Sequence, residues 1–191
     1  VGRMLKHFQR AELAQRGIAR VYWTYDPLVS KPAHPNLNLL GARVMESVRD
    51  MYGTTASPLH NGLATDRLIV SCSTAGDADR ATRAFAPQAP HAPVLTPEPR
   101  AGDVTAALDA PDRAPMVLVE IPVDFQLLAA QSPERGARWH DAVRTHFEWA
   151  LHRGYEVTGL QRDPVTSRAF YVFALPRAGA PLLLLIRAAL P

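Results

Sequence analysis

The first 25 residues carry two different patterns of apolar positions. Between residues 2 and 16, apolar side chains recur three or four positions apart with cations between them, which predicts an amphipathic helix. Gly17 stands where a glycine commonly ends a helix. The apolar run 18–25 shows no clean alternation, so we expect a strand that is covered on both faces, as in the interior of a sheet.

Prolines and glycines divide the next stretch into short elements. Pro32 and Pro35 can occupy only the first turn of a helix or precede it. We therefore expect a short helix over 35–40, and Gly41 marks its end.

Two further strands are expected over 42–51 and 66–73, separated by a loop that includes 54–58. Helix, strand, short helix and strands in succession are typical of an α/β fold. The fold class predicted from the sequence is thus α/β with a mixed sheet, in which the three strands form an antiparallel edge.

The composition changes over 74–115, a segment rich in Ala, Pro, Asp and Arg that is typical of a semi-rigid linker. We place a domain boundary there. The apolar run 116–121 predicts a strand, and Ser132-Pro133 is a strong helix start because serine caps the helix and proline fits its first turn.

The helix that starts at Ser132-Pro133 is expected to run to residue 152 or 153 and to end at Gly154. Two strands follow over 155–162 and 169–175, so that 116–175 is predicted to be a small β–α–β–β accessory domain. The tail 176–191 completes the chain, and no internal repeat is evident.

Composition narrows the class of protein. A hydrophobic fraction of 47% in 191 residues is ample for a packed core. The single cysteine, Cys72, excludes an intramolecular disulfide and a cysteine zinc site, and within a strand it is typical of a small buried hydrophobe. No signal peptide is visible, and the longest apolar run, 181–186, is far shorter than the roughly 20 residues of a membrane helix. We expect a soluble, cytoplasmic protein without a membrane partner.

The charge is concentrated in one place. The chain carries +3, but its first 20 residues hold five cations against Glu12 alone, which is +4. A nucleic-acid-binding face would spread its cations and interleave aromatic residues, so nucleic acid is not an expected partner. A cluster on one helix suits a small polyanion such as the phosphates of a cofactor, or it is simply a solvated helix face.

Two stretches near the start of the chain carry a resemblance to a known family: VGRML at 1–5, and the strand and short helix of 18–41. They are similar to the end of the phosphate-binding motif, and to the strand and short helix that follow it, in the GNAT superfamily of acyl-CoA N-acyltransferases. DMYG at 50–53 and HNGLATDRL at 60–68 resemble a subgroup of predicted acetyltransferases associated with N-acylamino-acid metabolism. VEIP at 119–122 is similar to the extension of that subgroup.

The resemblance implies that 1–73 is the C-terminal half of a GNAT domain whose upstream strands lie outside this sequence. This polypeptide alone is then expected to be inactive. The implied co-substrate is acetyl-CoA or succinyl-CoA, with no metal, and the acceptor is the amine of an amino-acid-like molecule. Self-association into a homodimer stays open.

The resemblance and the side-chain chemistry together single out site residues. The residues expected to bind the cofactor are Gly2, Arg3, Lys6, Asn36 and Asn38. Those expected to bind the substrate are Tyr25, Asp26 and Arg67. The position at which many GNAT enzymes carry a general-acid tyrosine is Leu37 here, so Tyr52 and His34 are the candidate catalytic groups.

Two other interpretations remain. The chain could be a GNAT-like ligand-binding or interaction module without catalysis, which the leucine at position 37 favours. Each candidate side chain also has an ordinary structural alternative, such as a packed strand tyrosine for Tyr25 or a surface ion pair for Arg67.

Overall fold

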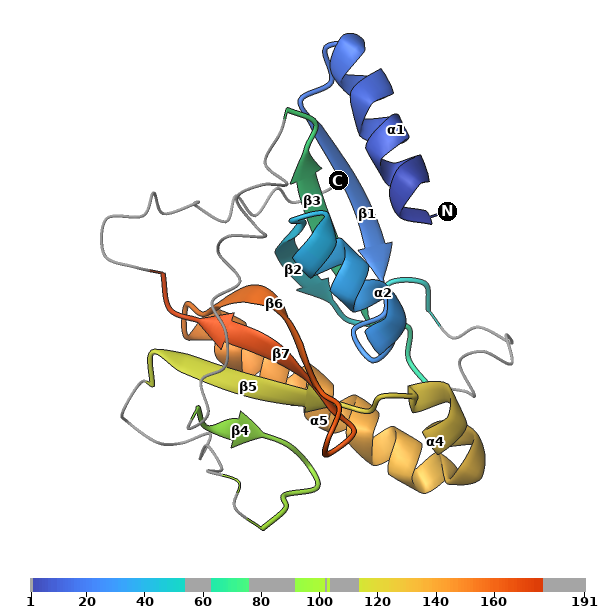
Figure 1. Ribbon diagram of the computed structural model, residues 1–191. Helices are drawn as coiled ribbons and strands as arrows, with labels where there is room; N and C mark the ends of the chain where they lie inside the picture. The colour runs from blue at the N-terminus through green and yellow to red at the C-terminus, as the bar shows by residue number, and fades with distance from the viewer. Residues whose placement is uncertain (1, 54–62, 76–91, 102, 104–113, 177–191) are drawn as a thin grey trace.

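The computed structural model describes residues 2–53, 63–75, 92–101, 103 and 114–176, and it contains two β-sheets with associated helices (Figure 1). The chain is thus a mixed α/β protein with one antiparallel and one mixed sheet. In the part that the structure describes, no helix combines the length and apolar character needed to cross a membrane.

The N-terminal sheet has three antiparallel strands in the order β1-β3-β2. Their bounds are β1 Arg20–Tyr25, β2 Arg43–Val48 and β3 Arg67–Ser73. The predicted antiparallel arrangement is confirmed, but the prediction that β1 is covered on both faces is wrong. β1 is an edge strand among the described residues, and only its last residue, Tyr25, is buried. The central strand β3 supplies the core instead, with Leu68 and Val70 fully buried.

Helix α1 (Gly2–Gln15) lies alongside β1 and ends, as predicted, before Gly17, which has a φ of +73° (Figure 1). Its predicted apolar face is not packed against the described residues. Met4, Leu5 and Phe8 are each more than 60% exposed. The periodicity thus predicts the helix correctly without identifying what covers it.

The short helix after β1 is longer than predicted. It consists of α2 (Ser30–His34) followed without a break by a π-helical turn, η1 (Pro35–Leu39). Pro35 lacks the N–H that an α-helical hydrogen bond would need, and the Leu40 N–H reaches back five residues to the Pro35 carbonyl at 2.9 Å. Gly41 ends the segment with a φ of +64°, as expected.

The C-terminal sheet has the order β4-β5-β7-β6. Strands β5 (Met116–Ile121), β6 (Glu156–Asp163) and β7 (Arg168–Ala174) and helix α5 (Pro133–His152) confirm the predicted β–α–β–β unit. The Ser132 hydroxyl caps α5 by accepting the Arg135 N–H at 3.3 Å. Two elements were not predicted, namely helix α4 (Phe125–Gln131) and strand β4 (Val94–Leu95).

Strand β4 lies within the segment that the composition assigned to a linker, and it pairs in parallel with β5. Residues 76–91, 102 and 104–113 of that segment, the loop 54–62 and the tail 177–191 lie outside the described residues. The linker is therefore in part a structural component of the C-terminal sheet.

The N-terminal unit, from β1 to β3, and the C-terminal unit, from β5 to β7, repeat one topology. In each, a helical segment joins the first two strands, and the third strand lies between them in antiparallel pairing. In each, a left-handed glycine, Gly41 or Gly154, stands two residues before the second strand, and that strand has a bulge at its third residue, Met45 or Thr158. The sequence pattern G-x-x-V-x-x-x-x-R-D occurs at 41–50 and again at 154–163.

The arginines of this repeated pattern make reciprocal contacts. Arg49 of the N-terminal unit pairs with Glu148 on α5, and Arg162 of the C-terminal unit donates to the Ser30 carbonyl at 3.1 Å, at the start of α2. Each unit thus reaches the helical segment of the other, as two subunits related by a twofold axis would.

The larger of two hydrophobic clusters among the described residues contains residues of both units. Phe147 on α5 packs edge-on against Tyr171 and Phe173 of β7, with ring centroids 4.9 and 5.0 Å apart. Tyr171 also reaches the N-terminal unit, because its hydroxyl donates to the Pro27 carbonyl at 3.0 Å. The C-terminal unit is therefore packed into the fold and is not an independent appendage.

Candidate active site between the two units

A pocket of about 200 Å³ lies where β1 ends. The N-terminal unit contributes the residues just after β1 and those around the start of β3, and the C-terminal unit contributes helices α4 and α5. The residues that line it are Asp26, Leu28, Val29, Leu63, Ala64, Arg67, Phe125, Gln126 and His140. The carboxyl end of a strand is where α/β proteins commonly present polar groups to a ligand.

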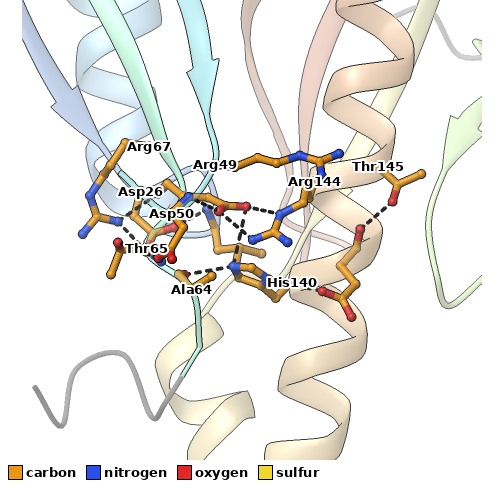
Figure 2. Close-up of polar contacts among 12 residues, drawn as sticks. Asp26, Arg49, Asp50, Ala64, Thr65, Arg67, His140, Arg144 and Thr145 are labelled. Carbon is orange, nitrogen blue, oxygen red and sulfur yellow. Dashed lines mark hydrogen bonds and ion pairs between the residues drawn. The ribbon is translucent and has the colours of Figure 1, made fainter. Parts of the chain in front are cut away.

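Two of the three predicted substrate-binding residues meet in this pocket. Asp26 accepts the Leu28 N–H at 2.9 Å through Oδ1, which closes the turn after β1, and its Oδ2 lies 3.2 Å from Arg67 Nη1 (Figure 2). Arg67 Nη1 also donates to the Asp66 carbonyl at 3.0 Å. Among the described residues, no acceptor bonds Nε or Nη2 of Arg67, so the guanidinium keeps donors for a ligand.

The predicted catalytic residue Tyr52 lies next to this ion pair. The Arg67 guanidinium lies over its ring, 5.3 Å from the centroid. The Tyr52 hydroxyl is 3.0 Å from Thr24 Oγ1 on β1, and the side chain is 56% exposed. A phenol, a guanidinium and a carboxylate therefore gather at the end of β1.

A polar network behind the pocket joins the two units (Figure 2). Arg144 on α5 donates to both carboxylate oxygens of Asp66, at 2.7 Å each, and the Asp50 N–H donates to Asp66 Oδ1 at 2.9 Å. His140 Nε2 is 3.0 Å from the Ala64 carbonyl oxygen, and because a carbonyl only accepts, this nitrogen carries the proton. The residues that precede β3 are thus fixed to α5.

The charge state of Asp66 follows from this network. Burial opposes its ionisation, but the hydrogen bonds from Arg144 and from the Asp50 N–H, together with the nearby His140, outweigh burial and hold the pKa of the carboxyl below its usual range. Asp66 is therefore ionised at neutral pH and balances the charge of Arg144.

The third predicted substrate-binding residue, Tyr25, lies in the core and does not line the pocket. Only 7% of it is exposed. Its hydroxyl lies beside that of Tyr171 but makes no hydrogen bond of normal geometry with the described residues. Burial raises the pKa of Tyr25 well above its usual value. A packed strand tyrosine, the ordinary alternative for this residue, fits this environment.

The residues predicted on the short helix have structural partners. Asn36 accepts the Trp23 Nε1–H at 3.3 Å, whereas Asn38 bonds the backbone of Leu160 through both ends of its amide. The two side chains point toward different units, as their spacing predicts. His34 is half-buried, and its pKa is lowered by burial and by the nearby Arg162, so it is neutral at physiological pH.

The predicted phosphate-binding residues lie at the start of α1, away from the pocket residues in sequence. Gly2 is the first residue of the helix, as expected. Lys6 Nζ lies 4.7 Å from the centroid of the Trp23 ring, and Trp23 in turn donates to Asn36. Two of the predicted cofactor residues are thus connected through one tryptophan. The side chain of Arg3 lies outside the described residues.

Sequence reasoning missed the contribution of the C-terminal unit. Phe125 and Gln126 lie on a helix that was not predicted, and His140 and Arg144 were not singled out. Their only signal was the spacing of four residues between His140 and Arg144, which places both on one face of a helix.

A second pocket, of about 160 Å³, lies at the end of β5 and is lined in part by Glu120 and Trp139. Its position in the C-terminal unit corresponds to that of the first pocket in the N-terminal unit. Within the described ranges, no group of three or more His, Cys, Asp or Glu side chains is placed to hold a metal ion. Comparison with protein-family models, with curated proteins and with solved structures finds no match to this chain.

Proposed function

We propose that the protein is an acyl-CoA-dependent N-acyltransferase of the GNAT type, which transfers an acetyl or succinyl group to the amine of an amino-acid-like substrate. The observation that carries this proposal is the meeting of Asp26, Arg67 and Tyr52 beside a pocket at the end of β1. A carboxylate can hold an amine, a guanidinium can hold a carboxylate, and a phenol can donate a proton.

The order of the elements supports the same proposal. Helix α1, strand β1 and the short helical segment ended by Gly41 follow one another as the resemblance to GNAT proteins implies. Backbone N–H groups at the start of a helix favour phosphate, and Lys6 adds a positive charge there. Lys6 contacts the ring of Trp23, and Trp23 donates to Asn36, so the first turns of this helix and the segment that carries Asn36 are in indirect contact.

The chemistry needs two proton movements. The neutral amine attacks the thioester carbonyl, the tetrahedral intermediate collapses, and the C–S bond breaks to release the CoA thiolate. Asp26 accepts the proton that the attacking nitrogen loses, directly or through a water molecule. Tyr52 donates a proton to the departing sulfur and is then reprotonated, so that overall one N–H is exchanged for one S–H.

The test uses the full-length product of the reading frame that encodes residues 1–191. Calorimetric titration should detect binding of CoA, acetyl-CoA and succinyl-CoA. Release of the CoA thiol should report acyl transfer to amino acids. Tyr52→Phe is expected to lower kcat by about 10²-fold, in the range of general acid catalysis. Tyr22→Phe is the matched control, because Tyr22 is an equally exposed tyrosine on β1 outside the site.

Failure to bind CoA or either acyl-CoA would rule out the acyltransferase. A second candidate function, a ligand-binding module without catalysis, is favoured by one observation: Leu37, at the position of the usual acid, is only 3% exposed and belongs to the core. That module would bind ligand in the same titrations without releasing a thiol.

A further inference from the structure

The C-terminal unit supplies one wall of the pocket at the end of β1. Phe125 and Gln126, at the start of α4, and His140 of α5 line the pocket together with Asp26 and Arg67. We propose that α4 determines which acceptor the enzyme takes, and that the pocket selects an amine that carries a carboxylate and an uncharged, apolar side chain. This inference rests on the proposed acyltransferase function and assigns the specificity of its acceptor site.

The pocket is assembled rigidly from both units. The Ser30 hydroxyl donates to the Val123 carbonyl at 2.9 Å, two residues before Phe125, and His140 holds the Ala64 carbonyl at 3.0 Å. Asp124 caps α4 by accepting the Leu127 N–H at 3.1 Å. Because these bonds fix both walls before a ligand enters, the pocket loses little freedom on binding and can discriminate by shape.

The charges in the pocket specify a carboxylate. Arg67 is the cation that lines it, and only Nη1 of its guanidinium is engaged with the Asp66 carbonyl and with Asp26. In the part of the chain that the structure describes, its other nitrogens have no acceptor. A ligand carboxylate can therefore accept two hydrogen bonds from the guanidinium, which is the geometry that arginine favours.

The rest of the pocket specifies an apolar, uncharged side chain. Leu28, Val29, Leu63 and Phe125 supply apolar surface. Asp26 is the carboxylate that lines the pocket, and the proposed reaction assigns it to the acceptor's amine. Asp66 lies outside the lining and is paired with Arg144, so among the described lining residues no second carboxylate balances a cationic side chain. The volume of about 200 Å³ is below the roughly 300–1,000 Å³ of pockets for larger ligands, which limits the acceptor to a compact molecule.

The selection of an acceptor with a carboxylate and an apolar side chain can be tested by measuring binding alone, without acyl transfer. Titration calorimetry on the full-length protein would compare L-leucine with glycine, with L-lysine, with 3-methylbutylamine and with 4-methylpentanoate. We expect L-leucine to bind at least about tenfold more tightly than each of the others, a difference of about 1.4 kcal/mol. Equal affinity for glycine or L-lysine would overturn the proposed side-chain selection, and equal affinity for 3-methylbutylamine would overturn the role of Arg67.

Two matched variants of α4 test whether this helix causes the preference for L-leucine. Phe125→Ala should weaken L-leucine at least fivefold and leave glycine unchanged. Leu127→Ala, an exposed residue of the same helix outside the pocket, should change neither. An unchanged affinity for L-leucine in Phe125→Ala, with native stability retained, would contradict the inference.

The two proposals fail in different ways. CoA binding and thiol release with no preference among acceptors would overturn the acceptor site described here and leave the acyltransferase standing. Binding of L-leucine without binding of CoA would overturn the acyltransferase and leave the binding site for L-leucine standing.

Discussion

Arg144 and Asp66 form a bidentate ion pair, with both N–O distances at 2.7 Å, between the middle of α5 and the residue before β3. Only 9% of the Asp66 side chain and 24% of the Arg144 side chain are exposed. The pair joins the two units directly behind the pocket, so its integrity bears on stability and on the position of the pocket wall.

Removing the charge of Asp66 should destabilise the fold. Asp66→Asn keeps the size of the side chain but leaves Arg144 without its counter-charge, and we expect a loss of about 2–3 kcal/mol in the free energy of unfolding measured with urea. Because the pKa of Asp66 is lowered in the folded state, the wild-type advantage is present above about pH 4 and shrinks as the pH falls.

The control for this variant is Glu12→Gln. Glu12 of α1 pairs at 3.8 Å with Arg16, the residue after the helix, and both side chains are exposed. Losing such a pair should cost no more than about 0.5 kcal/mol. A coupling energy near zero in the double-mutant cycle of Asp66→Asn with Arg144→Met would contradict the role given to the pair.

His146 should make the protein acid-sensitive before the carboxylates titrate. It is buried on α5, Nδ1 has no hydrogen-bond partner among the described residues, and burial lowers its pKa to about 4. The unfolded chain therefore binds a proton at about pH 6.5, whereas the folded chain does not, so that stability falls as the pH drops from about 6.5 to 4.

His146→Leu removes this proton-binding group and should flatten the dependence of unfolding free energy on pH in that window. The wild-type slope is bounded at about 1.4 kcal/mol per pH unit for one group. Urea unfolding at a series of pH values measures both slopes, and parallel curves for the two proteins would show that His146 is not the cause.

Gly136 is required for the contact between α4 and α5. A Cβ at this position would lie 2.8 Å from the Ala129 Cβ and 3.0 Å from its Cα. Gly136→Ala gains about 1 kcal/mol of helix propensity but overpacks the contact by about 1–3 kcal/mol, so we expect a net loss in thermal unfolding. Ala129→Gly should recover part of the loss, and a more stable single variant would refute the contact.

Tyr25 and Tyr171 should stay protonated in the folded protein at alkaline pH. Burial raises the pKa of both phenols, so that the stability they contribute is full below about pH 10 and is lost as the pH rises further. Phenolate absorbance should therefore show at least two of the five tyrosines ionising only on unfolding. If all five ionised in the folded state, the buried environment would be disproved.

Local signals in the sequence predicted the local structure well. Ser132 and Pro133 start α5, and Gly17, Gly41 and Gly154 end helical segments, because capping and left-handed turns depend on a few adjacent residues. Helix α4 was not predicted because its seven residues are too few to show a clear helical period.

Which strands pair with one another was harder to predict from the sequence. The apolar run of β1 was consistent with an interior strand, but periodicity does not say which strand pairs on either side. The repeat of the two units escaped notice because only four of ten positions in 41–50 and 154–163 are identical, and its bulges and strand order are visible only in three dimensions.

In the candidate site, too, some residues could be predicted from the sequence and others could not. Asp26, Arg67 and Tyr52 were selected by side-chain chemistry, and the fold brings them together. Phe125 and His140 lie about 100 residues further along the chain, and no local pattern links them to the end of β1. Of the nine residues that line the pocket, side-chain chemistry thus predicted Asp26 and Arg67, and the rest of the lining depends on how the chain packs.

The amide of Asn38 has one more consequence. It accepts the Leu160 N–H at 2.9 Å and donates to the Leu160 carbonyl at 2.8 Å, so that a side chain occupies hydrogen-bonding positions on the free edge of β6 where another strand could pair. Open strand edges are the usual starting points for intermolecular β-aggregation. Asn38 therefore blocks strand pairing at Leu160, on this edge of the C-terminal sheet.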